Sequence, residues 1–293
     1  MTLTVSEAPE ATALQPMTDL LRGRRVVVLA GAGCSTESGI PDYRGPQGSL
    51  RTRKPMQYQD FVRGERFRAR YWARSAVGWP RFSAARPNAA HHALAELEAA
   101  GVVPGIITQN VDGLHHAAGS RRVVELHGTL AAVRCLGCGE TRPRADFQSA
   151  LMEMNAEWAD RLLRPAVVDA VEQAPDGDAE LPDSAYDSFQ VPPCAGCGGI
   201  IKPDVVFFGE NVPKEWVDDA WSLFGQGEVL LVAGSSLHVY SGRRFVYRAK
   251  ERGIPIAILN LGPTRADEMA AARVEATLGD ALPRIADALL RGG

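Results

Sequence analysis

The chain has 293 residues, which is enough for one large domain with a small insert. Its hydrophobic content of 45% and charged content of 23% are ordinary for a soluble globular protein. A net charge of −3 argues against a protein that holds nucleic acid through its overall charge. No apolar run is long enough to span a bilayer, so we expect no membrane partner.

The first segment, residues 1–20, contains acidic residues but neither arginine nor lysine. This pattern lacks the features of a secretory signal or a transit peptide. We expect a flexible tail on a cytoplasmic protein.

The first predicted element is a buried strand over Val26–Ala30, a continuous apolar run. Gly31 and Gly33 follow it directly, where a turn beside a phosphate needs residues without side chains. Thr36 stands where a dinucleotide-binding fingerprint has its third glycine. On the glycines alone, a tight turn that binds nothing is an equal alternative.

Residues 45–90 mix arginines with aromatic side chains. Such a mixture can stack nucleic acid, but a helical module with a solvated arginine face fits the chain's overall charge better. A helix then begins near Asn88, a suitable cap, and ends at Gly101.

Further strands are expected over residues 103–108, 123–126, 229–233 and 256–259. Each apolar run is followed by polar residues or glycine, as in Gln109-Asn110 and Gly234-Ser235. Doubly wound parallel sheets bind ligands along the carboxyl ends of their strands. The recurring arrangement therefore predicts an α/β fold with a Rossmann-like dinucleotide site.

Two Cys-x-x-Cys pairs, Cys135/Cys138 and Cys194/Cys197, flank a polar stretch. Paired knuckles with neighbouring glycines are typical of a tetrahedral zinc site. Four thiolates close the coordination sphere, so we expect one structural Zn²⁺ in a small domain over residues 129–200. The remaining residues, 21–128 and 201–291, would form a discontinuous NAD-binding domain that includes the 45–90 module.

The sequence GAGCSTESGIPDYRG, residues 31–45, resembles the signature of the sirtuins, the NAD-dependent protein-lysine deacylases. Tyr43 stands where most members have Phe. Segments such as Val239-Tyr-Ser-Gly and Pro255–Arg265 are most similar to the class II branch. The resemblance implies a cleavage of the nicotinamide glycosidic bond, with the acyl group passing to ADP-ribose.

The resemblance also implies cofactor contacts around the glycine turn, the nicotinamide pocket and the adenosine. The residues are Gly31, Ala32, Gly33, Ser35, Thr36, Pro41, Asp42, Tyr43, Arg44, Gln109, Asn110, Val111, Asp112, Gly234, Ser235, Ser236, Asn260, Leu261, Gly262 and Leu278. Taken singly, Asn110 and Asp112 could instead be ordinary turn residues.

His127 is the candidate general base, because imidazole titrates near neutrality and this residue stands where the family has its catalytic His-Gly. Asn110 and Asp112 complete the expected catalytic set. Without the resemblance, a histidine that only ends a strand would be the better interpretation. Cys34, left over from the zinc pairs, is either an oxidation site or an inert packed thiol.

The segment Lys202–Glu210 resembles the family's peptide-binding stretch, where an acyl-lysine peptide is held as an added strand. On the residues alone, a core strand is an equal alternative. Tyr71 and Arg74 resemble a pair that recognises carboxylated acyl chains; the alternative for Arg74 is a surface ion pair with Glu65. The expected substrate contacts are Val206, Phe207, Phe208, Gly209, Glu210, Val239, Tyr71 and Arg74.

Together these inferences predict an NAD-dependent protein-lysine deacylase that prefers acyl chains longer than acetyl and binds no nucleic acid directly. An NAD-dependent protein ADP-ribosyltransferase shares the same site and is the first alternative. A catalytically silent NAD-sensing scaffold is an alternative of another class.

Overall fold

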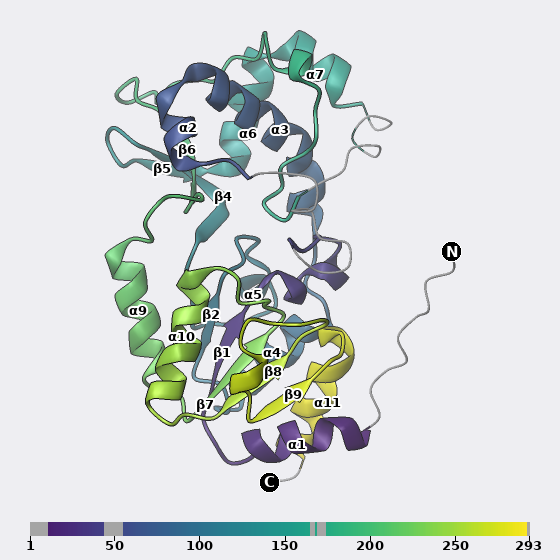
Figure 1. Cartoon of the computed structure of the whole chain (residues 1–293). Helices are drawn as coiled ribbons and strands as arrows, with labels where there is room; N and C mark the ends of the chain where they lie inside the picture. The colour runs from purple at the N-terminus through teal and green to yellow at the C-terminus, as the bar shows by residue number, and fades with distance from the viewer. Residues whose placement is uncertain (1–10, 44–54, 165–167, 169–173, 292–293) are drawn as a thin grey trace.

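The computed structural model describes residues 11–43, 55–164, 168 and 174–291 (Figure 1). Arg44 and residues 1–10 lie outside the described residues. The elements form two groups, one around a parallel sheet and one around a smaller antiparallel sheet (Figure 1).

The larger sheet has six parallel strands in the order β3-β2-β1-β7-β8-β9. They are β1 (Val26–Ala30), β2 (Ile106–Thr108), β3 (Val123–Glu125), β7 (Val229–Ala233), β8 (Ile256–Leu259) and β9 (Ala272–Val274). Every residue of β1, β7 and β8 is buried, as their continuous apolar runs require. The predicted parallel sheet is confirmed, and the order changes direction at β1, which pairs with both β2 and β7.

Helices cover both faces of this sheet. One face packs against α1 (Ala11–Leu21), α4 (Ala89–Ala99) and α11 (Leu278–Leu290). The other packs against α9 (Lys214–Phe224) and α10 (Tyr240–Glu251), and a short helix, α5 (Leu114–Ala117), follows β2. The connections also contain the 3₁₀ turns η1 (Ala32–Cys34), η2 (Thr36–Ser38) and η5 (Asp267–Met269).

The expectation of a flexible tail is wrong for residues 11–20, which form most of α1. Leu14 and Met17 are buried in the same core cluster as residues of α11 and β9. The apolar residues of this segment therefore form the inner face of a helix. The absence of a targeting signal does not exclude an amphipathic helix.

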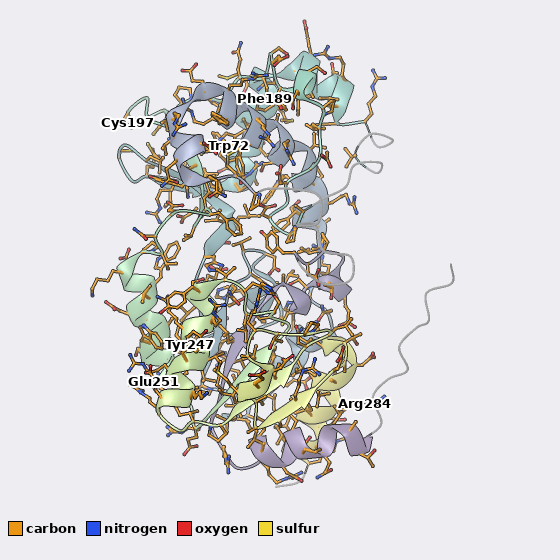
Figure 2. All side chains as sticks on the ribbon, viewed as in Figure 1. Trp72, Phe189, Cys197, Tyr247, Glu251 and Arg284 are labelled. Carbon is orange, nitrogen blue, oxygen red and sulfur yellow. The ribbon has the colours of Figure 1, made fainter. Side chains whose placement is uncertain are left out.

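The smaller sheet is antiparallel, in the order β5-β4-β6. Its strands are β4 (Gly128–Cys135), β5 (Thr141–Pro143) and β6 (Ile201–Val205). Around it lie α2 (Tyr58–Arg63), α3 (Glu65–Ala84), α6 (Arg144–Met154), α7 (Ala156–Leu162) and the turn η4 (Asp183–Ala185). Figure 2 places Trp72 and Phe189 within this group.

The helical segment expected over 45–90 is present as α2 and α3, but it packs with the small sheet. Phe61 and Trp72 share a core cluster with Leu130 and Val133 of β4. The Trp72 indole also donates to the carbonyl of Ile201, 3.2 Å away. The division into domains stays a prediction; these contacts group α2 and α3 with the zinc-binding elements. None of the described helices has the length and apolar character needed to cross a membrane.

Candidate active site

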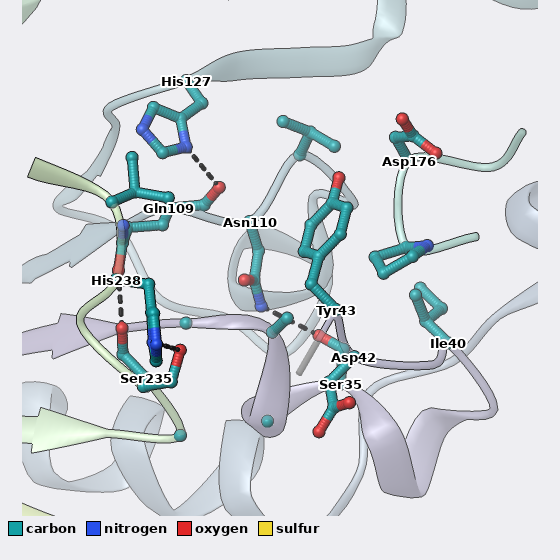
Figure 3. Close-up of a pocket in the computed structure, with 18 of the residues that line it drawn as sticks. Ser35, Ile40, Asp42, Tyr43, Gln109, Asn110, His127, Asp176, Ser235 and His238 are labelled. Atoms are coloured by element: carbon teal, nitrogen blue, oxygen red, sulfur yellow. Dashed lines mark hydrogen bonds between the residues drawn. The ribbon is translucent and has the colours of Figure 1, made fainter. Parts of the chain in front are cut away.

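A cavity of about 1400 Å³ lies at the carboxyl ends of β1, β2, β7 and β8, facing the small sheet (Figure 3). Apart from Arg44, every residue predicted to contact the cofactor lines it. The predicted substrate residues line it as well, with the exception of Arg74. The individual roles remain predictions, but the sequence-based selection converges on one site.

The glycine turn after β1 lies against the turn after β7. The Gly31 amide donates to the Ala233 carbonyl at 3.0 Å, and the Gly33 amide donates to the Gly234 carbonyl at 2.8 Å. A Cβ on Gly31 would lie 2.7 Å from the Ser235 Cβ, closer than real contacts allow. These glycines therefore let two turns touch, and their amides are engaged within the protein. The predicted reason, free amides beside a phosphate, is wrong for these two groups.

A polar network joins the β1 turn to the end of β2. Asn110 Nδ2 donates to Ser35 Oγ at 3.0 Å, and Ser35 Oγ donates to Asp112 Oδ2 at 2.6 Å. The other Asp112 oxygen accepts from the Leu114 amide at 2.9 Å. Burial raises the pKa of the Asp112 carboxyl, while the Ser35 and Leu114 bonds favour its charged form. The three side chains are thus held rigidly at the cavity wall.

His127 lies between β3 and β4, beside Gln109 in Figure 3. Its Nδ1 lies 2.9 Å from the Gln109 carbonyl oxygen, and its Nε2 lies 2.7 Å from Ser241 Oγ. A carbonyl only accepts, so Nδ1 carries the proton and Nε2 holds the lone pair. Burial lowers the pKa of His127, and the charge of Arg244 lowers it further against the effect of the Gln109 bond. The imidazole is therefore a neutral base at neutral pH.

Sequence reasoning missed Ser241 and His238, which also line the cavity. Ser241 carries no local signal, because its partner is 114 residues away. His238 bonds Ser236 through Nδ1 at 3.2 Å and accepts from Arg265 through Nε2 at 3.2 Å. Figure 3 shows His238 beside Ser235, on the wall opposite Asp176.

The proposed peptide-binding stretch leaves β6, an edge strand of the small sheet. The Val206 amide donates to the His127 carbonyl at 2.8 Å, and the Phe208 carbonyl accepts from the Tyr58 amide at 2.9 Å. The buried Lys202 forms an ion pair with Glu210 at 3.0 Å, and Glu210 also accepts from the Phe207 amide. The stretch is thus fixed as a wall of the cavity, and it ends in a turn in which the Glu210 amide donates to the Phe207 carbonyl at 3.1 Å.

Tyr71 and Arg74 do not act as the pair that the sequence suggested. Tyr71 lines the cavity within an aromatic cluster that includes Phe61 and Phe207. The Arg74 side chain is buried, and its Nε donates to Asp178 Oδ1 at 2.8 Å and to the Ala179 carbonyl at 2.9 Å. Recognition of an acyl carboxylate by Arg74 is therefore wrong, and so is the alternative ion pair with Glu65.

The four knuckle cysteines converge, with all four sulfur atoms within 4.8 Å of one another. Cys135 and Cys197 sulfurs lie 3.5 Å apart, and those of Cys138 and Cys194 lie 3.8 Å apart. Two thiolates on a tetrahedral Zn²⁺, with bonds of about 2.3 Å, would be about 3.8 Å apart. The set fits zinc and holds no catalytic side chain. Cys34, by contrast, is fully buried, and burial raises its thiol pKa to about 12, so it behaves as an inert packed residue.

Comparisons with known proteins agree with this geometry. Residues 31–241 match the model of the Sir2 family. An NAD-dependent protein deacetylase of Xanthomonas campestris is 52% identical over 96% of this chain and 92% of its own length. NAD-dependent protein deacetylase 2 of Bradyrhizobium diazoefficiens is 53% identical over 92% of this chain and 96% of its own.

Solved structures show the same relationship. A Sir2 enzyme structure superposes with a TM-score of 0.75 at 31% identity, covering 96% of this chain and 99% of the other. A Sir2 complex with a p53 peptide and NAD⁺ gives 0.72 at 30% identity over 96% and 98%. The branch within the family stays a prediction. The fold, the strand-end cavity and these relatives together establish that the chain belongs to the Sir2 family, the sirtuins.

Proposed function

We propose that this protein is an NAD-dependent protein-lysine deacylase, as its relatives' names describe them. The observation that carries the proposal is His127, a half-buried neutral imidazole with its proton fixed on Nδ1 and its basic Nε2 at the cavity. A silent scaffold would not need this base. A hydride-transferring dehydrogenase would not need this base next to an edge strand, because such a strand can hold a peptide substrate.

The cavity is large enough for a dinucleotide together with a substrate side chain, since pockets for single small ligands are about 300–1,000 Å³. NAD would lie along the turns after β1, β7 and β8, with Asn110 and Asp112 at its nicotinamide end and Asn260 near its adenosine. When bound, NAD supplies a glycosidic bond to nicotinamide, and the ADP-ribose left by its cleavage accepts the acyl group.

The chain's own groups divide the remaining work. Ser35 and Asp112 hold the nicotinamide side in place, while the Phe207 and Tyr71 rings exclude water from the acyl end. His127 Nε2 takes a proton from a hydroxyl, which makes that oxygen a nucleophile.

The substrate would be a protein segment bound as a strand beside residues 206–210, with an acyl-lysine entering the cavity. Support for this comes from the edge position of β6 and from the place of residues 206–210 in the wall of the cavity. Thiolate zinc ligands suit a reducing compartment, and we place the enzyme in the cytoplasm on that ground.

The test uses the full-length zinc-loaded protein with NAD and peptides carrying acetyl-, propionyl- or lipoyl-lysine, analysed by mass spectrometry. We expect deacylated peptide and O-acyl-ADP-ribose in equal amounts. ADP-ribosylated protein without deacylated peptide would contradict the proposal and favour the transferase alternative. A faster reaction on the acetyl peptide would contradict the expected preference for longer chains.

A further inference from the structure

The lone pair of His127 Nε2 does not face the cavity freely, because Ser241 lies on it. Ser241 Oγ is 2.7 Å from Nε2, while Nδ1 is committed to the Gln109 carbonyl. In this tautomer Nε2 can only accept, so the Ser241 hydroxyl is the donor. An imidazole nitrogen has one in-plane lone pair, and Ser241 occupies it.

Ser241 is held in this position by the first turn of α10. Arg244 Nε donates to the Ser241 carbonyl at 3.0 Å. The next residue, Gly242, packs so closely that a Cβ there would lie 2.6 Å from Gln109 Nε2. Gln109 in turn accepts from Ser235 Oγ at 2.8 Å. The start of α10 and the residue that anchors His127 are thus one packed unit.

Ser241 also lines the cavity, so its oxygen borders both the His127 imidazole and the cavity. One side bonds the base, and the other side is open to whatever fills the cavity. A hydroxyl can donate one proton while its oxygen accepts another. No other side chain among the described residues bonds Nε2.

We propose that the proton taken up by His127 reaches Nε2 through the Ser241 hydroxyl. The O–H bond of a substrate hydroxyl breaks as its proton binds Ser241 Oγ. At the same time the Ser241 O–H bond breaks and that proton binds Nε2. Serine is regenerated, imidazolium forms, and the electron pair left on the substrate oxygen makes it the nucleophile. This inference rests on the proposed function.

The same contact stabilises the product of the transfer. Once Nε2 carries the proton, Ser241 Oγ accepts from it, and a hydrogen bond from a charged donor is about twice as strong as a neutral one. That matters here, because burial and the charge of Arg244 both disfavour imidazolium. Removing the hydroxyl would leave a half-buried charged donor without this partner.

The first test needs no cofactor. Nitrogen-15 spectra of the histidine side chains in the free protein, with His127 assigned by comparison with His127→Ala, should show Nδ1 protonated and Nε2 as a hydrogen-bonded acceptor. Ser241→Ala should move the Nε2 resonance toward that of a free acceptor, and Ser241→Thr should restore it. A proton on Nε2, or an Nε2 resonance that does not shift in Ser241→Ala, would overturn the proposal.

The second test separates the steps of the reaction. We expect Ser241→Ala to lower deacylated product about tenfold to hundredfold, less than the roughly 10²- to 10⁴-fold that a whole general base contributes. Exchange of labelled nicotinamide into NAD should persist, because that step does not use the base. Ser241→Thr should recover most of the rate, and Ser222→Ala, on the exposed face of α9, serves as the matched control.

Unchanged product formation in Ser241→Ala, beside an active wild type, would overturn the relay alone. Equal losses of exchange and product would indicate a structural role and overturn it too. If the wild type produced no deacylated peptide, the proposed function itself would fail.

Discussion

The two sheets of this protein are stabilised in different ways. The six-stranded sheet has four strands in which every residue is buried and helices on both faces, so burial of apolar surface suffices. The three-stranded sheet has an entirely exposed strand, β5, and four cysteines at its end. Its core also contains the charged side chains of Arg144 and Lys202. Hydrophobic burial alone is enough for the first sheet, whereas the second depends on a metal and must also accommodate two buried cations. Lys202 forms an ion pair with Glu210, and the Arg144 guanidinium lies over the rings of Trp72 and Trp79.

The sharpest way to break this comparison is to remove the metal. Cys194→Ser should abolish stoichiometric zinc and unfold the small sheet, because structural zinc contributes on the order of 10 kcal/mol in small zinc modules. Metal analysis and hydrogen exchange by mass spectrometry would measure both effects. Protection of β1 and β7 should persist.

Cys34→Ala is the control, since this thiol is buried in the other core and far from zinc in sequence. It should leave the zinc content unchanged. Zinc-free Cys194→Ser with native protection in β4 and β6 would show that the small sheet does not depend on the metal.

The second prediction concerns chemistry that the large sheet positions. His127→Ala should lower deacylation by roughly 10²- to 10⁴-fold, the usual contribution of a general base. NAD affinity, measured by calorimetry, should stay close to wild type, because the base acts after the glycosidic bond breaks. Near-normal turnover in the mutant would exclude His127 as the base.

The third prediction addresses buried charge beside the small sheet. The Arg74 and Asp178 side chains are 8% and 16% exposed, so Arg74→Met should lower the free energy of unfolding by about 3–5 kcal/mol. Arg66→Met breaks a pair with Asp187 whose side chains are 73% and 63% exposed, and should cost about 0–1 kcal/mol.

Denaturant unfolding of both variants gives the comparison, and equal losses would contradict it. The ratio of succinyl to acetyl turnover should stay unchanged in Arg74→Met. A selective loss of succinyl turnover would return Arg74 to the substrate site.

The last prediction concerns pH, where the loss expected per pH unit is smaller than the loss expected from Arg74→Met. The rings of His91 and His115 contact each other at a tilt, with centroids 4.8 Å apart, and burial lowers their pKa values to about 4 and about 3. Below an unfolded pKa of about 6.5 the unfolded chain binds more protons, so stability falls as the pH drops toward 4, by up to about 1.4 kcal/mol per histidine and pH unit.

Melting temperatures between pH 7 and pH 4.5 would measure this slope. His115→Leu should flatten it, whereas His116→Gln, an exposed neighbour, should not. An unchanged slope in His115→Leu would remove this histidine as a source of acid sensitivity.

The large sheet could be predicted from the sequence because its signals are local. Val26–Ala30 and Val229–Ala233 are continuous apolar runs, and the structure has strands with the same bounds. The two Cys-x-x-Cys pairs are an equally local signal, and the structure brings their four sulfur atoms together. Contacts between distant residues could not be predicted: Ser241 meets His127 across 114 residues, and Arg74 meets Asp178 across 104. A side chain's partner depends on how elements pack, and no single-sequence pattern records that.

The strand order has a consequence for synthesis of the chain. β1 lies between β2 and β7, yet about 100 residues separate the end of β3 at Glu125 from the start of β7 at Val229. At about 5–20 residues per second, the nascent protein spends roughly 5–20 s with β1 as an open apolar edge. An unpaired edge of this kind invites association with other chains. We therefore expect the ribosome-bound intermediate, more than the finished enzyme, to need protection by chaperones.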